Sequence, residues 1–88
     1  DIKVVELKLG KLIIDLDDDY AGKKLWLNDI NEHSLYSFNL DPKGNYETDL
    51  VPGTYYISVP WSINVKIPIE SGKFTRWDGE NVYPPTPP

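Results

Sequence analysis

The 88-residue sequence contains no cysteine and no methionine, and it has a single histidine and a single arginine. Without cysteine, the chain can form neither a disulfide framework nor a metal site built on thiolates. The longest strictly apolar run covers only residues 12–14, so we expect no bilayer-spanning segment and no signal-peptide core. Because position 1 is not methionine, we expect the chain to be a processed or excised piece of a longer protein.

Positive charge is also scarce, since Asp and Glu outnumber Lys and Arg by 14 to 9 and the formal net charge is −5. Nucleic-acid binding depends on clustered Lys and Arg that displace counterions from phosphates. We therefore expect no nucleic-acid partner and no insertion into a membrane. No motif in the sequence indicates a cofactor, and we expect none.

The residues that are present alternate with a period of two, which is typical of β-strands. Alternating apolar positions predict seven or eight short strands, and no segment shows a capped helical stripe. One long strand is expected to run from Val5 to Leu16 with a bulge or a bend at Gly10. Pro68 cannot donate a ladder hydrogen bond, so its strand is predicted to be an edge or to carry a bulge. The pattern predicts an all-β, seven- to eight-stranded antiparallel β-sandwich.

The chain is long enough for one domain and too short for two. The ending YPPTPP, residues 83–88, is rich in proline, which removes backbone donors and favours extended polyproline II. We therefore predict a single β-sandwich domain over residues 1–80 and a proline-rich tail or linker over residues 81–88.

Three elements together resemble a known family. They are AGKKLWL at residues 21–27, GNY at residues 44–46 and LVPGTYYISV at residues 50–59. In this order they resemble the transthyretin-like (prealbumin-like) β-sandwiches, especially carboxypeptidase regulatory-like domains. The resemblance implies a seven-stranded Greek-key sandwich that accompanies other domains as a scaffold, spacer or binding module, and it does not imply an enzyme.

A weaker similarity links the chain to the collagen-adhesin B-type repeats, which often carry a Lys–Asn isopeptide bond. Lys8 or Lys11 with Asn64 or Asn81 would be the corresponding pairs. The family's acid is missing from the strand that reads YYISV, and alternation turns both lysines outward. We therefore expect no isopeptide bond.

Few residues indicate chemistry. Asp15, Asp17 and Asp19 are candidate Ca²⁺ ligands within the acidic run of residues 15–19, although the run lacks the glycine and distal Glu of an EF-hand loop. The alternative is a solvated turn that ends a strand. His33 alone cannot form a zinc site and is expected to lie in a polar loop. We expect no catalytic residues.

Aromatic side chains give the best binding signal, with three Trp and six Tyr. Trp26 and Tyr56 alternate with apolar neighbours and are predicted to face outward, whereas Trp61 lies in a loop. Exposed aromatic rings stack on sugars or anchor protein partners. The candidate ligand-binding residues are Trp26, Tyr56, Trp61 and Trp77; the alternative is that they cover the core or pack on neighbouring domains.

By contrast, Tyr55 follows the Pro52-Gly53 turn and is predicted to enter the core and to hydrogen-bond the backbone through its hydroxyl. The sequence as a whole favours a non-catalytic module of a larger protein, a structural spacer or protein-interaction domain in a surface, secreted or virion protein. Its partners would be other domains of the parent chain or a separate protein. The alternative function is a carbohydrate-binding module that binds a glycan through exposed aromatics.

Overall fold

The computed structural model describes residues 8–61 and 64–88 and contains eight strands and one short 3-10 helix in these residues. No helix in the described part is long and apolar enough to cross a membrane. The elements are β1 (Gly10–Asp15), η1 (Asp18–Tyr20), β2 (Lys24–Asn28), β3 (Ser34–Asn39), β4 (Asn45–Leu50), β5 (Gly53–Ser58), β6 (Val65–Ile69), β7 (Phe74–Trp77) and β8 (Val82–Thr86).

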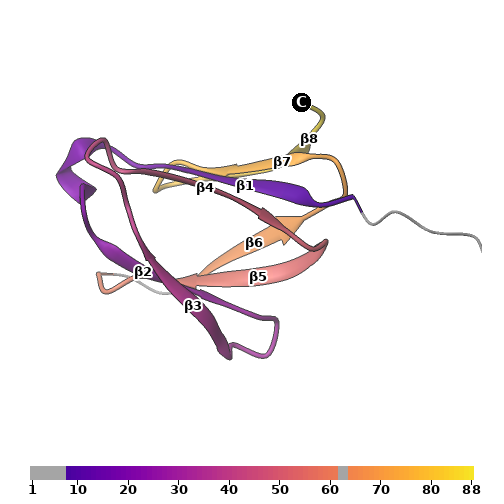
Figure 1. The fold of residues 1–88 in the computed structure, drawn as a ribbon, viewed down its shortest axis with the longest axis horizontal. Coiled ribbons are helices and arrows are strands. Elements are labelled where there is room, and N and C mark those ends of the chain that lie inside the picture. Colours follow the sequence, from indigo (N-terminus) through magenta and orange to yellow (C-terminus); the bar gives the residue numbers. More distant parts are fainter. Residues whose placement is uncertain (1–7, 62–63) are drawn as a thin grey trace, which may run out of the picture.

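The strands form two four-stranded sheets that lie face to face (Figure 1). One sheet has the order β4-β1-β7-β8 and the other has the order β3-β2-β5-β6. The predicted all-β sandwich is confirmed. One strand pair departs from the expected antiparallel pattern, because β1 runs parallel to β7.

The core lies between the sheets and follows from the alternation in each strand. In β1, Leu12 and Ile14 are fully buried, whereas Lys11 and Ile13 are half-buried on the other face. In β2, Leu25 and Leu27 are buried, and in β5 Ile57 is buried. The core consists of Leu12, Ile14, Leu16, Leu25, Leu27, Phe38, Leu40, Leu50, Ile57, Val59, Ile67, Ile69 and Trp77.

Asp41 and Gly44 form the turn that carries the chain from β3 in one sheet to β4 in the other. The Asp41 carboxylate accepts hydrogen bonds from the backbone N–H of Lys43 at 2.8 Å and of Asn45 at 2.9 Å. These bonds, that to Asn45 first, hold the pKa of Asp41 below its ordinary value. Gly44 has a φ of 81°, which an L side chain adopts only at a cost.

The corner between β4 and β5 confirms the predicted role of Tyr55. The Tyr55 hydroxyl donates a hydrogen bond of 2.6 Å to the carbonyl oxygen of Val51, and the ring packs against the core. Leu50 is buried on the other side of the Pro52-Gly53 turn. This stretch therefore organises the fold.

Pro68 lies on β6, which is an edge strand as predicted. Its carbonyl oxygen accepts a 2.6 Å hydrogen bond from the buried hydroxyl of Thr75 on β7. Because β6 and β7 belong to different sheets, this bond ties the two layers together.

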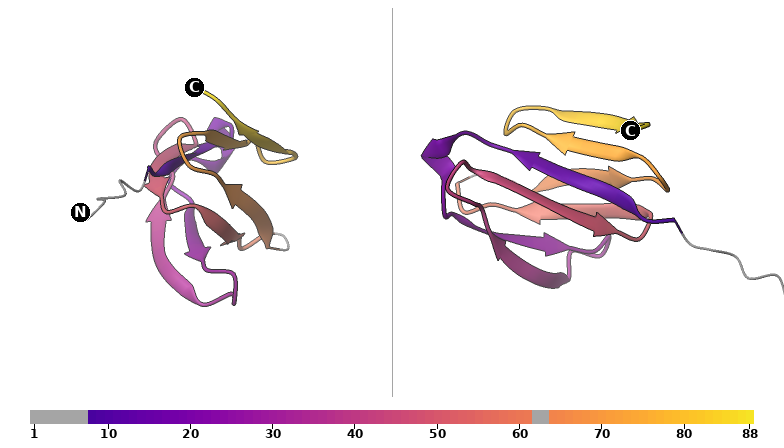
Figure 2. Two further views of the ribbon diagram at one scale, coloured as in Figure 1. Left: turned by 90° about the vertical axis from the view of Figure 1, so that its right-hand side faces the viewer. Right: turned by 45° about the horizontal axis from the view of Figure 1, so that its top comes forward.

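Two predicted boundaries differ from the structure. β1 begins at Gly10 and Leu9 is exposed, while Val5 and Leu7 lie outside the described residues. At the other end, Val82–Thr86 forms β8, an edge strand paired with β7, so the boundary predicted at residue 80 falls just before a strand of the sheet (Figure 2). Pro84 and Pro85 fit there because β8 is an edge strand and its register shifts between Phe74 and Arg76.

Candidate binding surfaces

The four predicted aromatic candidates lie in three separate places. Trp26 and Tyr56 share the outer face of the β3-β2-β5-β6 sheet, Trp61 lies in the loop after β5, and Trp77 belongs to the core. Only the first two are therefore brought together, and Trp77 cannot contact a ligand at the surface.

Strand register places Trp26 and Tyr56 on one face. Trp26 pairs with Ser58 and Asn28 pairs with Tyr56 across β2 and β5. Directly opposed residues point to the same side of a sheet, and diagonal neighbours such as Trp26 and Tyr56 lie about 7–8 Å apart. Leu27 and Ile57 between them are buried, so this is the outer side.

We call this surface the aromatic face and define it as Trp26, Asn28, Tyr56, Ser58 and Ser37. Ser37 joins it from β3, where it pairs directly with Trp26. Trp26 is 37% exposed, whereas Tyr56 is half-buried. The face therefore offers aromatic surface on two neighbouring strands.

A chain of polar contacts runs beside these rings. The Asn28 amide donates to the Ser58 hydroxyl at 2.7 Å, and that hydroxyl donates to the Asn64 side-chain oxygen at 3.0 Å. The Asn64 amide in turn reaches Glu32 at 3.4 Å. These polar contacts were not predicted from the sequence. Asn28 follows Trp26 by two residues and Ser58 follows Tyr56 by two residues, so period-two alternation places each on the same side of its strand as the aromatic residue.

Trp77 corrects the prediction that all four aromatics are available to a ligand. It is 3% exposed and pairs with Ile14 on β1 and Val82 on β8. Its neighbour Arg76 points outward and forms an ion pair with Asp15 at 2.7 Å. Alternation then turns Trp77 inward.

Trp61 stacks at a tilt on Tyr20, with ring centroids 4.8 Å apart. Trp61 is 41% exposed, and Tyr20 also lines a pocket of about 260 Å³. The other residues of this pocket are Asp17, Asp78, Gly79 and Glu80. This end of the sandwich therefore combines an aromatic pair with acidic loops.

The acidic run is divided by the fold. Asp15 pairs with Arg76, while Asp17 caps η1 by accepting a hydrogen bond from the N–H of Asp19 at 3.1 Å. Ligand oxygens of Asp17, Asp18 and Asp19 lie within 4.8 Å of one another, and all three residues are exposed. These three, without the predicted Asp15, are the residues of the run placed to share a cation.

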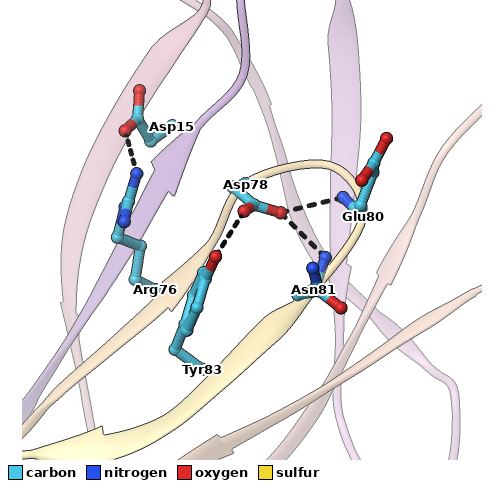
Figure 3. A network of polar contacts seen from close by, with 6 residues as sticks. All are labelled: Asp15, Arg76, Asp78, Glu80, Asn81 and Tyr83. Carbon is cyan, nitrogen blue, oxygen red and sulfur yellow. Dashed lines mark hydrogen bonds and ion pairs between the residues drawn. The ribbon is translucent and has the colours of Figure 1, made fainter.

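Asp78 organises the turn between β7 and β8 (Figure 3). Its carboxylate accepts hydrogen bonds from the N–H of Asn81 at 2.8 Å, the N–H of Glu80 at 3.0 Å and the hydroxyl of Tyr83 at 2.8 Å. These bonds, that from Asn81 first, lower the pKa of Asp78 to about 2. The hydrogen bond that the Tyr83 hydroxyl donates to this carboxylate raises the pKa of Tyr83. The carboxylate therefore stabilises a turn.

The remaining candidates have local structural roles. His33 is exposed in the loop between β2 and β3, where its N–H donates to the Asp29 carboxylate at 2.9 Å. Lys11 lies over the ring of Phe74, with 5.6 Å from its Nζ to the ring centroid. Asn64 is bonded to Ser58, in the sheet opposite the one that holds Lys11.

Comparison with known proteins gives no relative: no family model, no curated protein and no solved structure matches this chain.

Proposed function

We propose that this chain is a non-catalytic, transthyretin-like module of a larger protein, and that it binds a protein surface through the aromatic face. The single observation that carries the proposal is the placement of Trp26 and Tyr56 as diagonal neighbours on adjacent strands. The family assignment is supported by the strand order β4-β1-β7-β8 opposite β3-β2-β5-β6, with one parallel pair, and by the Tyr55 corner.

The energetic reason is the size and rigidity of the exposed groups. Tryptophan and tyrosine are enriched among the residues that dominate binding energy at protein interfaces, and 37% of Trp26 remains exposed for a partner to cover. Both project from strands that are paired on two sides, since β2 lies between β3 and β5 and β5 lies between β2 and β6. Little conformational entropy is therefore lost when a partner covers them.

Site-specific photo-crosslinking tests this proposal. A photoreactive phenylalanine analogue in place of Trp26, in the parent protein and in the cells that make it, should give a covalent adduct to protein. The same analogue in place of Trp61 is the matched control, because Trp61 is similarly exposed but lies in the loop after β5. The absence of an adduct from position 26, or equal adducts from both positions, would contradict the proposal.

Carbohydrate binding is the second candidate function, and the hydrogen-bonded side chains beside Trp26 favour it specifically. Ser58 pairs directly with Trp26, and its hydroxyl is bonded to the side chains of Asn28 and Asn64. Sugar recognition combines stacking on a flat ring with hydrogen bonds to hydroxyl groups, which this arrangement supplies.

A glycan panel read by tryptophan fluorescence separates the two functions. If the face binds sugar, one glycan class should give a saturable change that Trp26→Ala abolishes and Trp61→Ala retains. A flat response to every glycan, together with a protein adduct from position 26, would leave protein binding as the function of the aromatic face.

A further inference from the structure

The free edge of β3 differs from the other sheet edges of the described structure. The edge strands are β4 and β8 in one sheet and β3 and β6 in the other. An uncovered edge exposes a row of unpaired backbone donors and acceptors, which natural proteins normally protect with charge, proline or a bulge.

Three of these edges carry such protection. β6 contains Lys66 and Pro68, and β8 contains two consecutive prolines at its register shift. β4 contains the exposed acids Glu47 and Asp49. By contrast, β3 reads SLYSFN, without a charge or a proline. Its only irregularity is the bulge at Leu35, near the start of the strand, which leaves residues 36–39 in regular pairing.

The hydrogen-bond pattern shows which β3 groups face outward. The N–H of Leu40 donates to the carbonyl of Lys23 at 3.0 Å, which identifies that position as a hydrogen-bonded pair. Hydrogen-bonded and non-hydrogen-bonded pairs alternate along an antiparallel ladder. Phe38 and Tyr36 therefore bond to β2, whereas the backbone groups of Ser37 and Asn39 point to the free edge. In both views of Figure 2, β3 lies at the outer margin of its sheet.

We propose that two copies of this chain pair antiparallel through β3, with the two-fold axis perpendicular to the sheet at Ser37. In this register, the core-facing sides of the two paired β3 strands lie on the same side of the joined sheet. The core residues of both copies therefore stay buried. Ser37 then exchanges both backbone hydrogen bonds with the same residue of the second copy. Tyr36, which is 37% exposed, comes opposite Phe38 of the second copy.

Charge favours the β3 edge over the β4 edge for pairing with a second copy. Two chains that each carry a net charge of −5 repel one another, and pairing through β4 would add repulsion between Glu47 and Asp49 of the two copies. β3 brings no ionised side chain into the pair. The product is one continuous sheet of eight strands whose outer side carries two copies of the aromatic face, so a partner could be bound twice.

Sedimentation equilibrium across a concentration series tests the pairing. The wild-type chain should show a concentration-dependent species of twice its 10.1 kDa mass. Ser37→Pro removes an outward donor without removing a bond to β2, and it should weaken dimerisation by about tenfold or more. Ser37→Ala keeps the donor and should dimerise like the wild type. A monomer at every concentration, or an unchanged dimer in Ser37→Pro, would overturn the proposal.

Cysteine crosslinking gives a second measurement that does not depend on proline being tolerated. In the proposed register the two Ser37 Cα atoms lie about 5.5 Å apart, within disulfide range. Because the chain has no cysteine, Ser37→Cys should form a single disulfide-linked dimer under mild oxidation. Ser71→Cys, in the exposed turn before β7, is the matched control and should stay monomeric. Equal crosslinking of both variants would count against the β3 interface.

Discussion

Tyr55 shows at the scale of one residue how the β4–β5 corner is held. Its hydroxyl donates the 2.6 Å bond to the Val51 carbonyl while its ring packs on the core. Tyr55→Phe keeps the ring and removes only that bond, so the free energy of unfolding should fall by about 1 kcal/mol in a urea titration.

Tyr56→Phe is the control for this comparison, since Tyr56 is the next residue and faces the outer side of the same strand. Its free energy of unfolding should stay within about 0.5 kcal/mol of the wild type. A larger loss in Tyr56→Phe than in Tyr55→Phe would mean that the corner bond contributes little to stability.

Asp78 links one residue to the pH dependence of stability. Its pKa falls from an ordinary value of 3.8 to about 2 in the folded chain, because the β7–β8 turn donates hydrogen bonds to the ionised carboxylate. A lowered pKa stabilises the fold above the unfolded pKa, and this stabilisation is lost as the pH falls through the folded pKa. The stability advantage of the wild type over Asp78→Asn should therefore shrink between about pH 4 and about pH 2.

Thermal unfolding at several pH values measures that difference. Glu80→Gln is the matched control, because Glu80 donates to Asp78 through its backbone N–H, which glutamine retains. An Asp78→Asn difference that stays constant over this range would contradict the assignment of the turn bonds to the ionised carboxylate.

Individual residues were predictable from sequence where local alternation and turn type agree. Tyr55 follows a Pro-Gly turn and alternates with Ile57, so its inward position could be predicted. Trp77 stands in a strand of only four residues, and it is buried where this strand pairs with β1 at Ile14. A pairing with so distant a segment leaves no local trace in the sequence.

At the scale of an element, the β3–β4 connection depends on Gly44. It combines a positive φ of 81° with close approach, since an added Cβ would clash with the carbonyl of Asp17. Gly44→Ala should therefore lower the free energy of unfolding by about 3 kcal/mol or more, measured by urea titration.

Gly22→Ala separates the cost of the positive φ from the cost of the clash with Asp17. Gly22 has a similar φ of 72°, but nothing lies within 4 Å of an added Cβ. It should lose only about 1 kcal/mol, the backbone contribution. Equal losses in the two variants would show that the contact with Asp17 relaxes without cost.

Most elements could be predicted because each has a period-two pattern and a turn signal beside it. β8 could not, since Pro84 and Pro85 favour polyproline II and argue against a strand when read locally. Prolines are acceptable in β8 because it is an edge strand, with β7 on one side and no strand on the other.

The whole molecule is a sandwich closed by pairings between distant segments. The alternation predicted two layers, and the two layers are observed. The parallel β1–β7 pair joins residues about 60 positions apart, and the Thr75 bond to Pro68 crosses between sheets. Of the binding surface, the outward direction of Trp26 was predictable. Its neighbours on β5 and β3 were not, because period-two patterning specifies faces and not strand order.

The C-terminal strand gives the sharpest test of this global view. If residues 81–88 were only a linker, removing residues 82–88 would leave stability unchanged. In the structure, β8 pairs with β7, Val82 packs on the core beside Trp77, and Tyr83 bonds Asp78. Truncation after Asn81 should therefore lower the free energy of unfolding by about 2 kcal/mol or more.

Removal of residues 87–88 alone is the matched truncation, because these residues follow β8 and belong to no strand. It should unfold at the same urea concentration as the full chain, whereas the chain that ends at Asn81 unfolds earlier. The longer truncation also uncovers the edge of β7 next to Trp77, so its tryptophan fluorescence should respond more to an added quencher. Identical unfolding of both truncated chains would place the domain boundary back at residue 80.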